Sequence, residues 1–232
     1  MPDLRAHRAA APWFRRLYLP AYQIRDAARY TGVTSQAISN WHHRPLDEQG
    51  AALPIRERRQ PLNYLELVET AVVAVFRGIG VPLRSIRSTR EYMAQNFQSE
   101  FPFAEYRFKT DGFHLLMNLV DAVPRLRTDD LIVADRGGQL GWASMMEDRL
   151  LQFDYDREYE IALMWHVAGR ESRVLIDPRI EFGAPMVRGI PTWTLKGRWK
   201  AGESIEDIQD DFGLDRGEIE DALRFENVSL AA

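Results

Sequence analysis

The chain has 232 residues, of which 45% are hydrophobic and 28% are charged. This composition excludes a disordered chain and predicts a globular protein with enough length for two domains. The absence of cysteine excludes disulfides, thiolate zinc sites and cysteine nucleophiles, and it fits a reducing cytoplasm. No apolar run approaches the roughly 20 residues of a membrane-spanning helix, and the arginine-containing N-terminus lacks the apolar core of a signal peptide.

Charge is distributed unevenly along the chain, although the formal net charge is only -4. Residues 1–60 hold ten arginines and five acidic residues, whereas residues 129–232 hold twelve basic and twenty-two acidic residues. A basic N-terminal part before an acidic C-terminal part indicates that the N-terminal part meets an anion such as nucleic acid. A chance fluctuation of surface charge is the alternative interpretation.

The first predicted elements form a helical hairpin. An arginine-rich arm over residues 1–19 precedes a helix over residues 22–30, and Thr34 is placed to cap a second helix that runs to about His42. Gly32 lies between the helices, where a left-handed backbone conformation is needed. The pattern therefore predicts a helix-turn-helix motif, with an ordinary helical hairpin as the alternative.

The packing positions of this motif are filled suitably. Ala28 is small where the two helices cross, and three apolar residues are spaced to bury the second helix: Val33, Ile38 and Trp41. Five polar residues are left to face outward: Thr34, Ser35, Gln36, Ser39 and Asn40. Gln36 or Asn40 can make paired hydrogen bonds to an adenine edge. Ser35 and Ser39 are short enough to reach phosphate or base.

Basic side chains accompany this polar face. His42, His43 and Arg44 follow at the end of the second helix, where phosphates of bound DNA are expected. Three arginines of the next loop are expected to form a basic wing on neighbouring phosphates: Arg56, Arg58 and Arg59. Together with the polar face, they predict a DNA-binding site.

The elements that follow the hairpin suggest a larger DNA-binding domain. Residues 44–61 have prolines near both ends and a central glycine, which predicts a loop or short hairpin. Asn63 is placed to cap an apolar helix that stops at a glycine, and Pro82 suits the first turn of a helix over residues 82–96. This order resembles the MerR-type winged-helix domain over residues 20–97. MerR proteins continue with a long dimerising helix, whereas strand-like sequence follows here, so any dimer must form differently.

The rest of the chain is predicted to mix strands and helices. Strands joined by Asp-Gly and Gly-Gly turns are expected over residues 105–110, 111–120 and 129–142. Residues 145–153 look helical, and residues 157–169 fit a helix or a strand, with a strand favoured. Three helices are expected near residues 191–200, 204–212 and 215–226. Ser204 with Asp207 resembles a capping box, and Gly213 a helix stop.

Residues 174–226 carry a dense set of short motifs. They are an Ile-x-Asp-Pro-x-Ile start, a Gly-x-Pro-x-x-Arg-Gly turn with a following Ile-Pro, an Ala-Gly-x-Ser helix start and an Ile-x-x-Ala-Leu final helix. The matching residues are Ile176, Asp177, Pro178, Ile180, Gly183, Pro185, Arg188, Gly189, Ile190, Pro191, Ala201, Gly202, Ser204, Ile208, Ile219, Ala222 and Leu223. This segment resembles the domain-of-unknown-function 433 family, the VapB-like antitoxins. The Thr-Arg pair that this family usually has after the turn glycine is missing after Gly189.

The family resemblance implies a function and a partner. It implies an antitoxin of a type II toxin–antitoxin pair that binds its own promoter. The implied partner is a PIN-like toxin, a metal-dependent ribonuclease that is usually encoded next door. The residues favour DNA binding independently, whereas the toxin rests on the resemblance alone.

Other candidate groups have ordinary structural interpretations. Asp129, Asp130 and Asp135 lack neighbouring His or Glu residues and are expected to be solvated turn residues rather than metal ligands. His114 and His166 are expected to be satisfied core residues. The alternating acids of the segment DYDREYE are expected to mark the wet face of a strand: Asp154, Asp156, Glu158 and Glu160.

Two features of the C-terminal part concern surfaces. Trp193 and Trp199 lie six residues apart, so we expect one in the core and one at an interface. The acidic residues of this part form either a solvated face or a surface for a basic toxin. They are Glu203, Glu206, Asp207, Asp210, Asp211 and Asp215.

The sequence therefore predicts an α+β, mainly α protein in three parts. They are a MerR-like winged-helix DNA-binding domain (residues 1–97), a mixed central or dimerisation region (98–172) and a VapB-like module with a winged-helix-like helical fold (173–232). We expect a cytoplasmic homodimer that binds double-stranded operator DNA, represses its operon and neutralises a PIN-like toxin. It is expected to be no enzyme, with no cofactor and no metal. The alternative is a stand-alone MerR-like regulator whose later part senses a ligand or protein.

Overall fold

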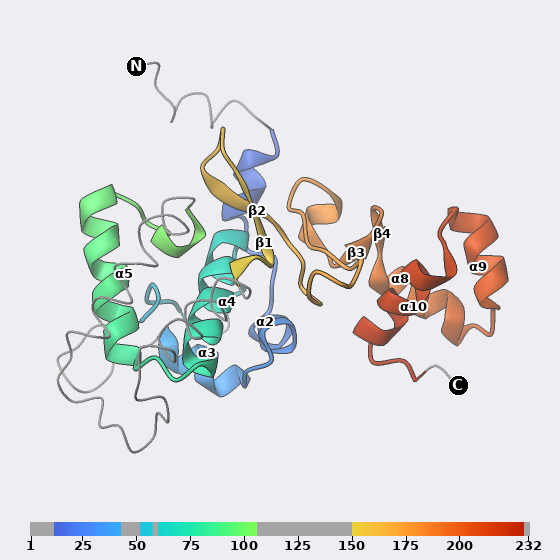
Figure 1. Cartoon of the computed structure of the whole chain (residues 1–232), viewed down its shortest axis with the longest axis horizontal. Coiled ribbons are helices and arrows are strands. Elements are labelled where there is room, and N and C mark those ends of the chain that lie inside the picture. Colours follow the sequence, from blue (N-terminus) through green and yellow to red (C-terminus); the bar gives the residue numbers. More distant parts are fainter. Residues whose placement is uncertain (1–11, 43–51, 58–59, 106–149, 230–232) are drawn as a thin grey trace, which may run out of the picture.

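The computed structural model describes residues 12–42, 52–57, 60–105 and 150–229, and these residues are mainly helical. Two small antiparallel sheets accompany the helices, which confirms the predicted α+β, mainly α class. In Figure 1 the helices α2, α3 and α5 lie around α4 in the left part of the view, and three C-terminal helices lie at the right. The strands lie between these two groups (Figure 1).

The predicted helical hairpin is present. It consists of α2 (Ile24–Thr31) and α3 (Ser35–Trp41), and a short 3-10 helix, η1 (Phe14–Tyr18), precedes it. At the start of α2, the Asp26 carboxylate accepts a hydrogen bond from the Gln23 amide. At the start of α3, the Thr34 hydroxyl accepts one from the Ala37 amide, so the predicted cap is confirmed.

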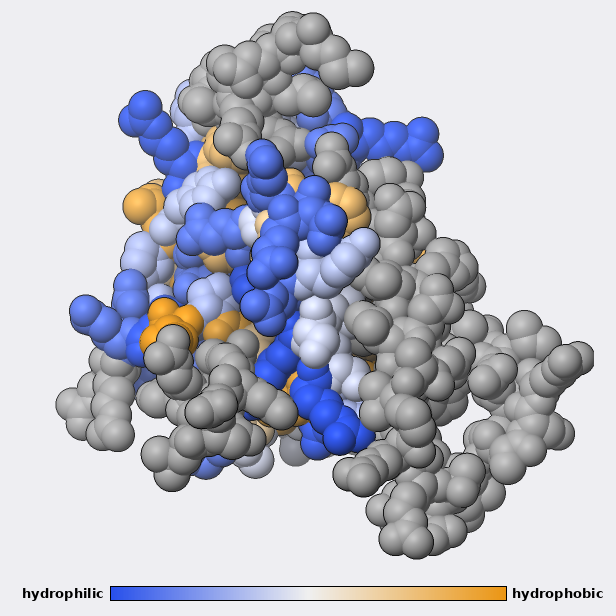
Figure 2. Space-filling view, turned by 90° about the vertical axis from the view of Figure 1, so that its left-hand side faces the viewer, coloured by the Kyte–Doolittle hydropathy of each residue, from blue (hydrophilic) through white to orange (hydrophobic). Residues whose placement is uncertain are grey.

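Two helices of 15 residues follow, namely α4 (Tyr64–Gly78) and α5 (Leu83–Phe97). Asn63 and Glu66 form a capping box at the start of α4, which confirms the predicted cap. Pro82 precedes α5 instead of lying within its first turn. Most of α4 is buried, whereas α5 exposes many polar side chains. The face that carries α5 is mainly hydrophilic where it is coloured (Figure 2).

The strands bring distant parts of the chain together. A first hairpin pairs β1 (Phe153–Asp156) with β2 (Ile161–Trp165), and a second pairs β3 (Met186–Val187) with β4 (Ile190–Pro191). Single bridges between Trp165 and Ile176 and between Leu175 and Met186 connect these two hairpins. The strand favoured within residues 157–169 is therefore confirmed as β2.

The predicted helix over residues 145–153 is wrong at its end. Only Leu150 is helical among its described residues, and Phe153 already begins β1, where it pairs with Trp165. Pairing with β2 decides the conformation of this short apolar segment, and the local pattern does not contain that partner. The strands predicted over residues 111–120 and 129–142 lie outside the described residues, as do residues 106–110.

Three short helices complete the chain and confirm the predicted ones. They are α8 (Thr192–Lys200), α9 (Ile205–Phe212) and α10 (Arg216–Phe225). Ser204 and Asp207 form the predicted capping box, and Gly213 ends α9 with a left-handed φ of 63°. A short 3-10 segment, η4 (Glu181–Gly183), precedes β3. None of the helices in the described part of the chain is long and apolar enough to cross a membrane.

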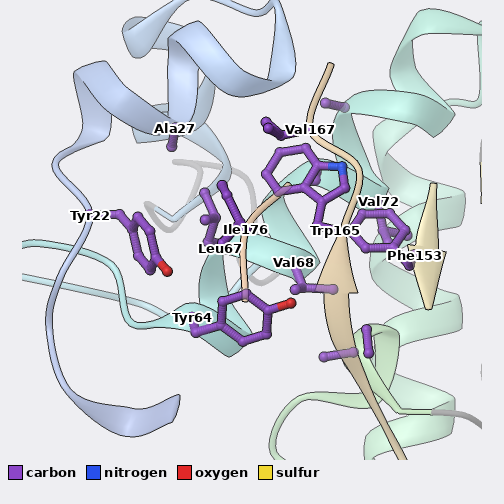
Figure 3. Close-up of a cluster of buried hydrophobic side chains, with 14 of the residues drawn as sticks. Tyr22, Ala27, Tyr64, Leu67, Val68, Val72, Phe153, Trp165, Val167 and Ile176 are labelled. Carbon is purple, nitrogen blue, oxygen red and sulfur yellow. The ribbon is translucent and has the colours of Figure 1, made fainter. Parts of the chain in front are cut away.

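One connected cluster of buried apolar side chains joins the N-terminal and C-terminal parts. Figure 3 shows members of this cluster from several segments, among them Ala27 of α2, Leu67 and Val68 of α4, Trp165 of β2, and Ile176. Because Ile176 lies at the start of the C-terminal motif segment, that segment shares its core with the hairpin of α2 and α3. The domain boundaries near residues 97 and 172 stay predictions.

Candidate nucleic-acid interface

The hairpin of α2 and α3 has the local geometry that its sequence predicts. Gly32 has a left-handed φ of 71°, and its amide donates to the Ala28 carbonyl oxygen at 3.0 Å, which ends α2. Ile38 and Trp41 are buried, and Val33 packs against the core. The second helix is therefore fixed on the first by its apolar side, and its other side is left to solvent.

The outward side of α3 is polar and uncharged. Ser35, Gln36 and Asn40 are exposed, and Ser39 is half-buried. Gln36 Nε2 donates a hydrogen bond to Asn40 Oδ1 at 2.8 Å, one helical turn further on. This bond leaves the Gln36 oxygen as an acceptor and the Asn40 nitrogen as a donor. Thr34 is exposed too, but its hydroxyl is engaged in the helix cap.

Two basic side chains that the sequence places at the interface are engaged elsewhere. His42 is buried, and its Nδ1 lies 2.8 Å from the Pro54 carbonyl oxygen. The Arg56 side chain is only 6% exposed, with Nε 3.1 Å from a carboxylate oxygen of Glu66. The loop that contains Arg56 packs against the start of α4. Because both side chains are buried, neither is suited to contact a phosphate. Four further candidates lie outside the described residues: His43, Arg44, Arg58 and Arg59.

Helix α2 is anchored to the C-terminal helices by contacts that the sequence does not announce. Arg29 Nη1 lies 3.1 Å from Glu226 Oε2, and its guanidinium stacks 4.9 Å from the Phe225 ring centre. Tyr30 stacks on Phe225 at 5.9 Å. The residues joined are 197 positions apart in the chain, so no local pattern contains this contact.

Glu226 is the buried centre of this joint. Its carboxylate accepts hydrogen bonds from Thr192 Oγ1 at 2.7 Å and from Lys196 Nζ at 3.2 Å, besides the ion pair with Arg29. Burial alone raises the pKa of Glu226, but the Thr192 hydroxyl and the two cations outweigh it and hold the pKa below its ordinary value. The carboxylate is therefore ionised in the folded protein.

Replacing this carboxylate by an amide tests the joint. We expect Glu226→Gln to lower the free energy of unfolding by about 1–3 kcal/mol at pH 7, because two cations lose their charged acceptor. A depressed pKa gives stability that is present above the unfolded value of 4.5 and is lost as the pH falls through the folded pKa. Denaturant unfolding at pH 7 and below pH 4 should thus show a difference that shrinks in acid.

Glu220, a half-buried acid on the surface of α10, offers the control for that measurement. It pairs with Arg216 and Arg224 one turn away on the surface of α10, and such pairs contribute little. Glu220→Gln should change the free energy of unfolding by less than about 0.5 kcal/mol. An equal loss for both variants would show that Glu226 has no special part in the joint.

The acids of β1 make ion pairs and hydrogen bonds with nearby groups. Asp154 contacts both His166 Nε2, at 2.9 Å, and the Arg170 guanidinium, and these two partners lower its pKa although burial opposes them. Asp156 accepts hydrogen bonds from the amides of the following turn. Glu158 lies in that turn and not on a strand, so the predicted alternating strand face is wrong beyond Asp156. Glu160 lies in the same turn and is likewise not part of a strand.

The acidic C-terminal residues mostly have partners within the chain. Arg198 pairs with Glu203 and Asp211, and Glu206 pairs with Arg216. Asp207 and Asp215 cap α9 and α10. Among the described residues no group of His, Asp and Glu could hold a metal ion. The predicted positions Asp129, Asp130, Asp135 and His114 lie outside the described residues.

Neither tryptophan is a fully buried core residue, so the predicted core position is approached only by packing against the core. Trp199 packs against the core from a half-buried position, whereas Trp193 is largely exposed. The predicted interface for one of them stays a prediction.

A cleft of about 680 Å³ adjoins the hairpin. It is bounded by the turn at Gly32, by Ala71 and Ala74 of α4, by Trp165 of β2 and by the loop at Gly169. Small side chains on α4 leave this space open. The volume lies within the range of roughly 300–1,000 Å³ that is typical of small-molecule sites.

Comparisons with known proteins agree with this architecture. A family model described as "Protein of unknown function (DUF433)" matches residues 174–225. A protein of Mycobacterium tuberculosis (strain ATCC 25618 / H37Rv) named "Putative antitoxin VapB45" is 25% identical over 226 residues, which cover 90% of this chain and 94% of that protein. The X-ray crystal structure of Rv2018 from Mycobacterium tuberculosis has a TM-score of 0.68 at 22% identity, covering 88% of this chain and 98% of that one. The structural likeness shows a shared fold, and the chain is similar along most of its length to a protein named as an antitoxin.

Proposed function

We propose that this protein is an antitoxin that binds operator DNA through α3, represses its own operon and neutralises a PIN-like ribonuclease toxin. The observation that supports DNA binding most directly is the exposed pair of side-chain amides, Gln36 and Asn40, on an uncharged helix face. The similarity to a relative named as an antitoxin supports the toxin partner. In this proposal the protein is a non-enzymatic regulator of the cytoplasm.

The amide pair suits a purine edge. Adenine offers an amino donor and a ring-nitrogen acceptor in the major groove, and the pair keeps one acceptor on Gln36 and one donor on Asn40. Ser35 and Ser39 at the same face supply short hydroxyls for phosphates. One recognition helix covers too few base pairs for an operator, so the proposal includes a symmetric homodimer that reads two half-sites.

Replacing Gln36 tests direct readout. We expect Gln36→Ala to weaken binding to the DNA upstream of the gene by roughly 10-fold to 100-fold and to leave binding to scrambled DNA nearly unchanged. Gln95→Ala is the matched control, because Gln95 is also an exposed helical glutamine that bonds to a residue one turn away. Equal weakening on both DNA sequences would rule out a base-reading role for Gln36.

The basic loop has its own test. Arg58→Ala is expected to weaken binding to both DNA sequences. It should also reduce the slope of log affinity against log salt concentration by the amount that corresponds to about one phosphate contact. An unchanged salt dependence would remove Arg58 from the proposed phosphate contacts. Arg56 is left out of these contacts because Glu66 holds it in a buried ion pair.

A ligand-sensing regulator without a toxin is the second candidate function. The cleft beside Gly32 favours it, because a molecule bound there touches both the turn of the hairpin and α4. Co-expression with the product of the adjacent gene separates the two candidates. A stable complex supports the antitoxin, and its absence together with selective DNA binding supports the regulator.

A further inference from the structure

The segment that leads into β3 presents two apolar side chains to solvent. Phe182 is 70% exposed, the highest value for a large apolar side chain among the described residues, and Ile180 is 43% exposed. Both belong to η4 or its N-terminal flank. Isolated exposed apolar residues are common, so exposure alone assigns them no role.

The backbone at this segment is strained. Glu181, Phe182 and Gly183 have consecutive left-handed φ values of 45°, 52° and 76°. The left-handed conformation costs an ordinary L-residue on the order of 1 kcal/mol or more, whereas glycine adopts it freely. Two non-glycine residues in this conformation indicate a constraint beyond simple chain reversal, and such strain clusters at binding sites.

The base of the segment holds it in this conformation. The Gly183 carbonyl oxygen accepts a hydrogen bond from the buried Tyr22 hydroxyl at 3.0 Å. The buried Asp177 accepts from the Arg179 backbone amide at 2.9 Å and from its guanidinium. Ile180 and Phe182 are therefore displayed from a fixed support, and a partner that binds them loses little conformational entropy.

The chemistry around the two side chains is that of a protein contact. The Arg16 guanidinium lies 4.9 Å from the Phe182 ring centre and donates to the Arg179 carbonyl oxygen at 3.0 Å. Among the described residues, the structure gives Arg16 this ring and this carbonyl but no carboxylate. Aromatic and arginine side chains are enriched at the centres of protein interfaces. A partner that brings a carboxylate beside an apolar pocket satisfies both.

A second copy of this chain fits the surface poorly. In a two-fold pair this patch would face its own copy, which brings the Arg16 cations of both copies into one interface. A contact with a different patch of another copy would be head-to-tail and would not close into a dimer. DNA is disfavoured as well, because Phe182 and Ile180 are apolar and Glu181 is acidic.

We infer that Ile180 and Phe182 form the central contact for a protein toxin, with Arg16 pairing with a toxin carboxylate at the rim of an apolar pocket. This inference rests on the proposed antitoxin function and names its toxin-docking surface. In this inference the strained turn is kept because it directs the Phe182 side chain outward to the toxin.

The test uses the full-length protein and the purified product of the adjacent gene. Phe182→Gly should lower the affinity for that product at least 10-fold. The same variant should keep or raise the free energy of unfolding, because glycine relieves the left-handed strain at φ 52°. Ile180→Ser should also weaken the complex. A loss of affinity without a loss of stability separates a binding role from a structural one.

Tyr92→Ser is the matched control. Tyr92 is 49% exposed on the hydrophilic face of α5, and its replacement should leave the affinity unchanged. If the wild type binds the adjacent product and Phe182→Gly binds it equally well, the docking inference is wrong while the antitoxin function stands. If the wild type does not bind that product at all, the toxin part of the proposed function fails first. Loss of DNA binding in Phe182→Gly, with toxin binding kept, would assign the surface to DNA.

Discussion

The contribution of Glu69 to the free energy of unfolding is expected to fall as the pH rises from 4.5 to about 7, and Glu69→Gln is expected to remove this contribution. Burial raises the pKa of Glu69 from 4.5 to about 7, although Arg90 and the Phe103 amide oppose the shift. Between these two pH values the unfolded chain releases a proton that the folded chain keeps. Stability therefore decreases with rising pH over this interval, by up to about 3 kcal/mol for this group.

The position of Glu69 explains both its burial and its importance. Its Oε2 accepts hydrogen bonds from Arg90 Nε at 3.1 Å and Nη2 at 2.9 Å, and its Oε1 accepts from the Phe103 amide at 3.2 Å. One carboxyl group thus joins α4 to α5 and to the short helix η2 (Pro102–Ala104). Water does not reach it, because Glu69 is completely buried.

The measurement is denaturant unfolding of the wild type and the variant at several pH values between 4 and 8. Other groups titrate in this range, but they contribute equally to both proteins, so the difference between the two curves isolates Glu69. Glu91→Gln makes the same chemical change at an exposed position of α5 and should keep the wild-type slope. Identical slopes for the wild type and Glu69→Gln would contradict the raised pKa.

Local patterns were sufficient for the parts of the fold that depend on neighbouring residues. Thr34, Asn63 and Ser204 cap helices in the structure as their sequence positions predict, because a cap needs only a side-chain oxygen three residues before a free amide. The outward face of α3 followed in the same way from the helical period of its buried residues.

Contacts between distant segments were beyond such patterns. Arg56 looked like a free cation of a basic loop, yet it forms a buried ion pair with Glu66 at the start of α4. His42 looked like a phosphate contact, yet it turns inward to the Pro54 carbonyl. Arg29 meets Glu226 only in the folded chain. In each case a polar side chain contacts a charged or backbone group elsewhere in the chain. The residues next to it in sequence do not indicate which group that is.

Gly183→Ala is expected to lower the free energy of unfolding by about 3 kcal/mol or more. A Cβ atom at this position would lie 2.0 Å from the Tyr22 hydroxyl oxygen, and Tyr22 is buried against the core. The hydroxyl would have to move away from the Gly183 carbonyl, which it now reaches at 3.0 Å. The left-handed φ of 76° adds about 1 kcal/mol for any L-side chain, to which overpacking and the lost hydrogen bond contribute the rest.

Gly213→Ala separates the collision from the backbone term. Gly213 also has a left-handed φ, of 63°, but a Cβ atom there would meet nothing within 4 Å. Its replacement should cost only about 1 kcal/mol. Equal losses at the two glycines, measured by thermal or denaturant unfolding, would show that the Tyr22 contact is unimportant.

A double-mutant cycle with Tyr22→Phe identifies the colliding atom. Removing the hydroxyl oxygen leaves the ring carbon that carries it as the nearest atom, at 3.2 Å from the new Cβ, a distance that a small shift relieves. Gly183→Ala should therefore cost less in the Tyr22→Phe background than in the wild type, with a coupling energy of about 1–3 kcal/mol. Strict additivity would place the cost in the backbone alone. A large coupling would instead show that the Tyr22 hydroxyl oxygen determines how closely the segment before α2 packs against Gly183, which lies 161 residues further along the chain.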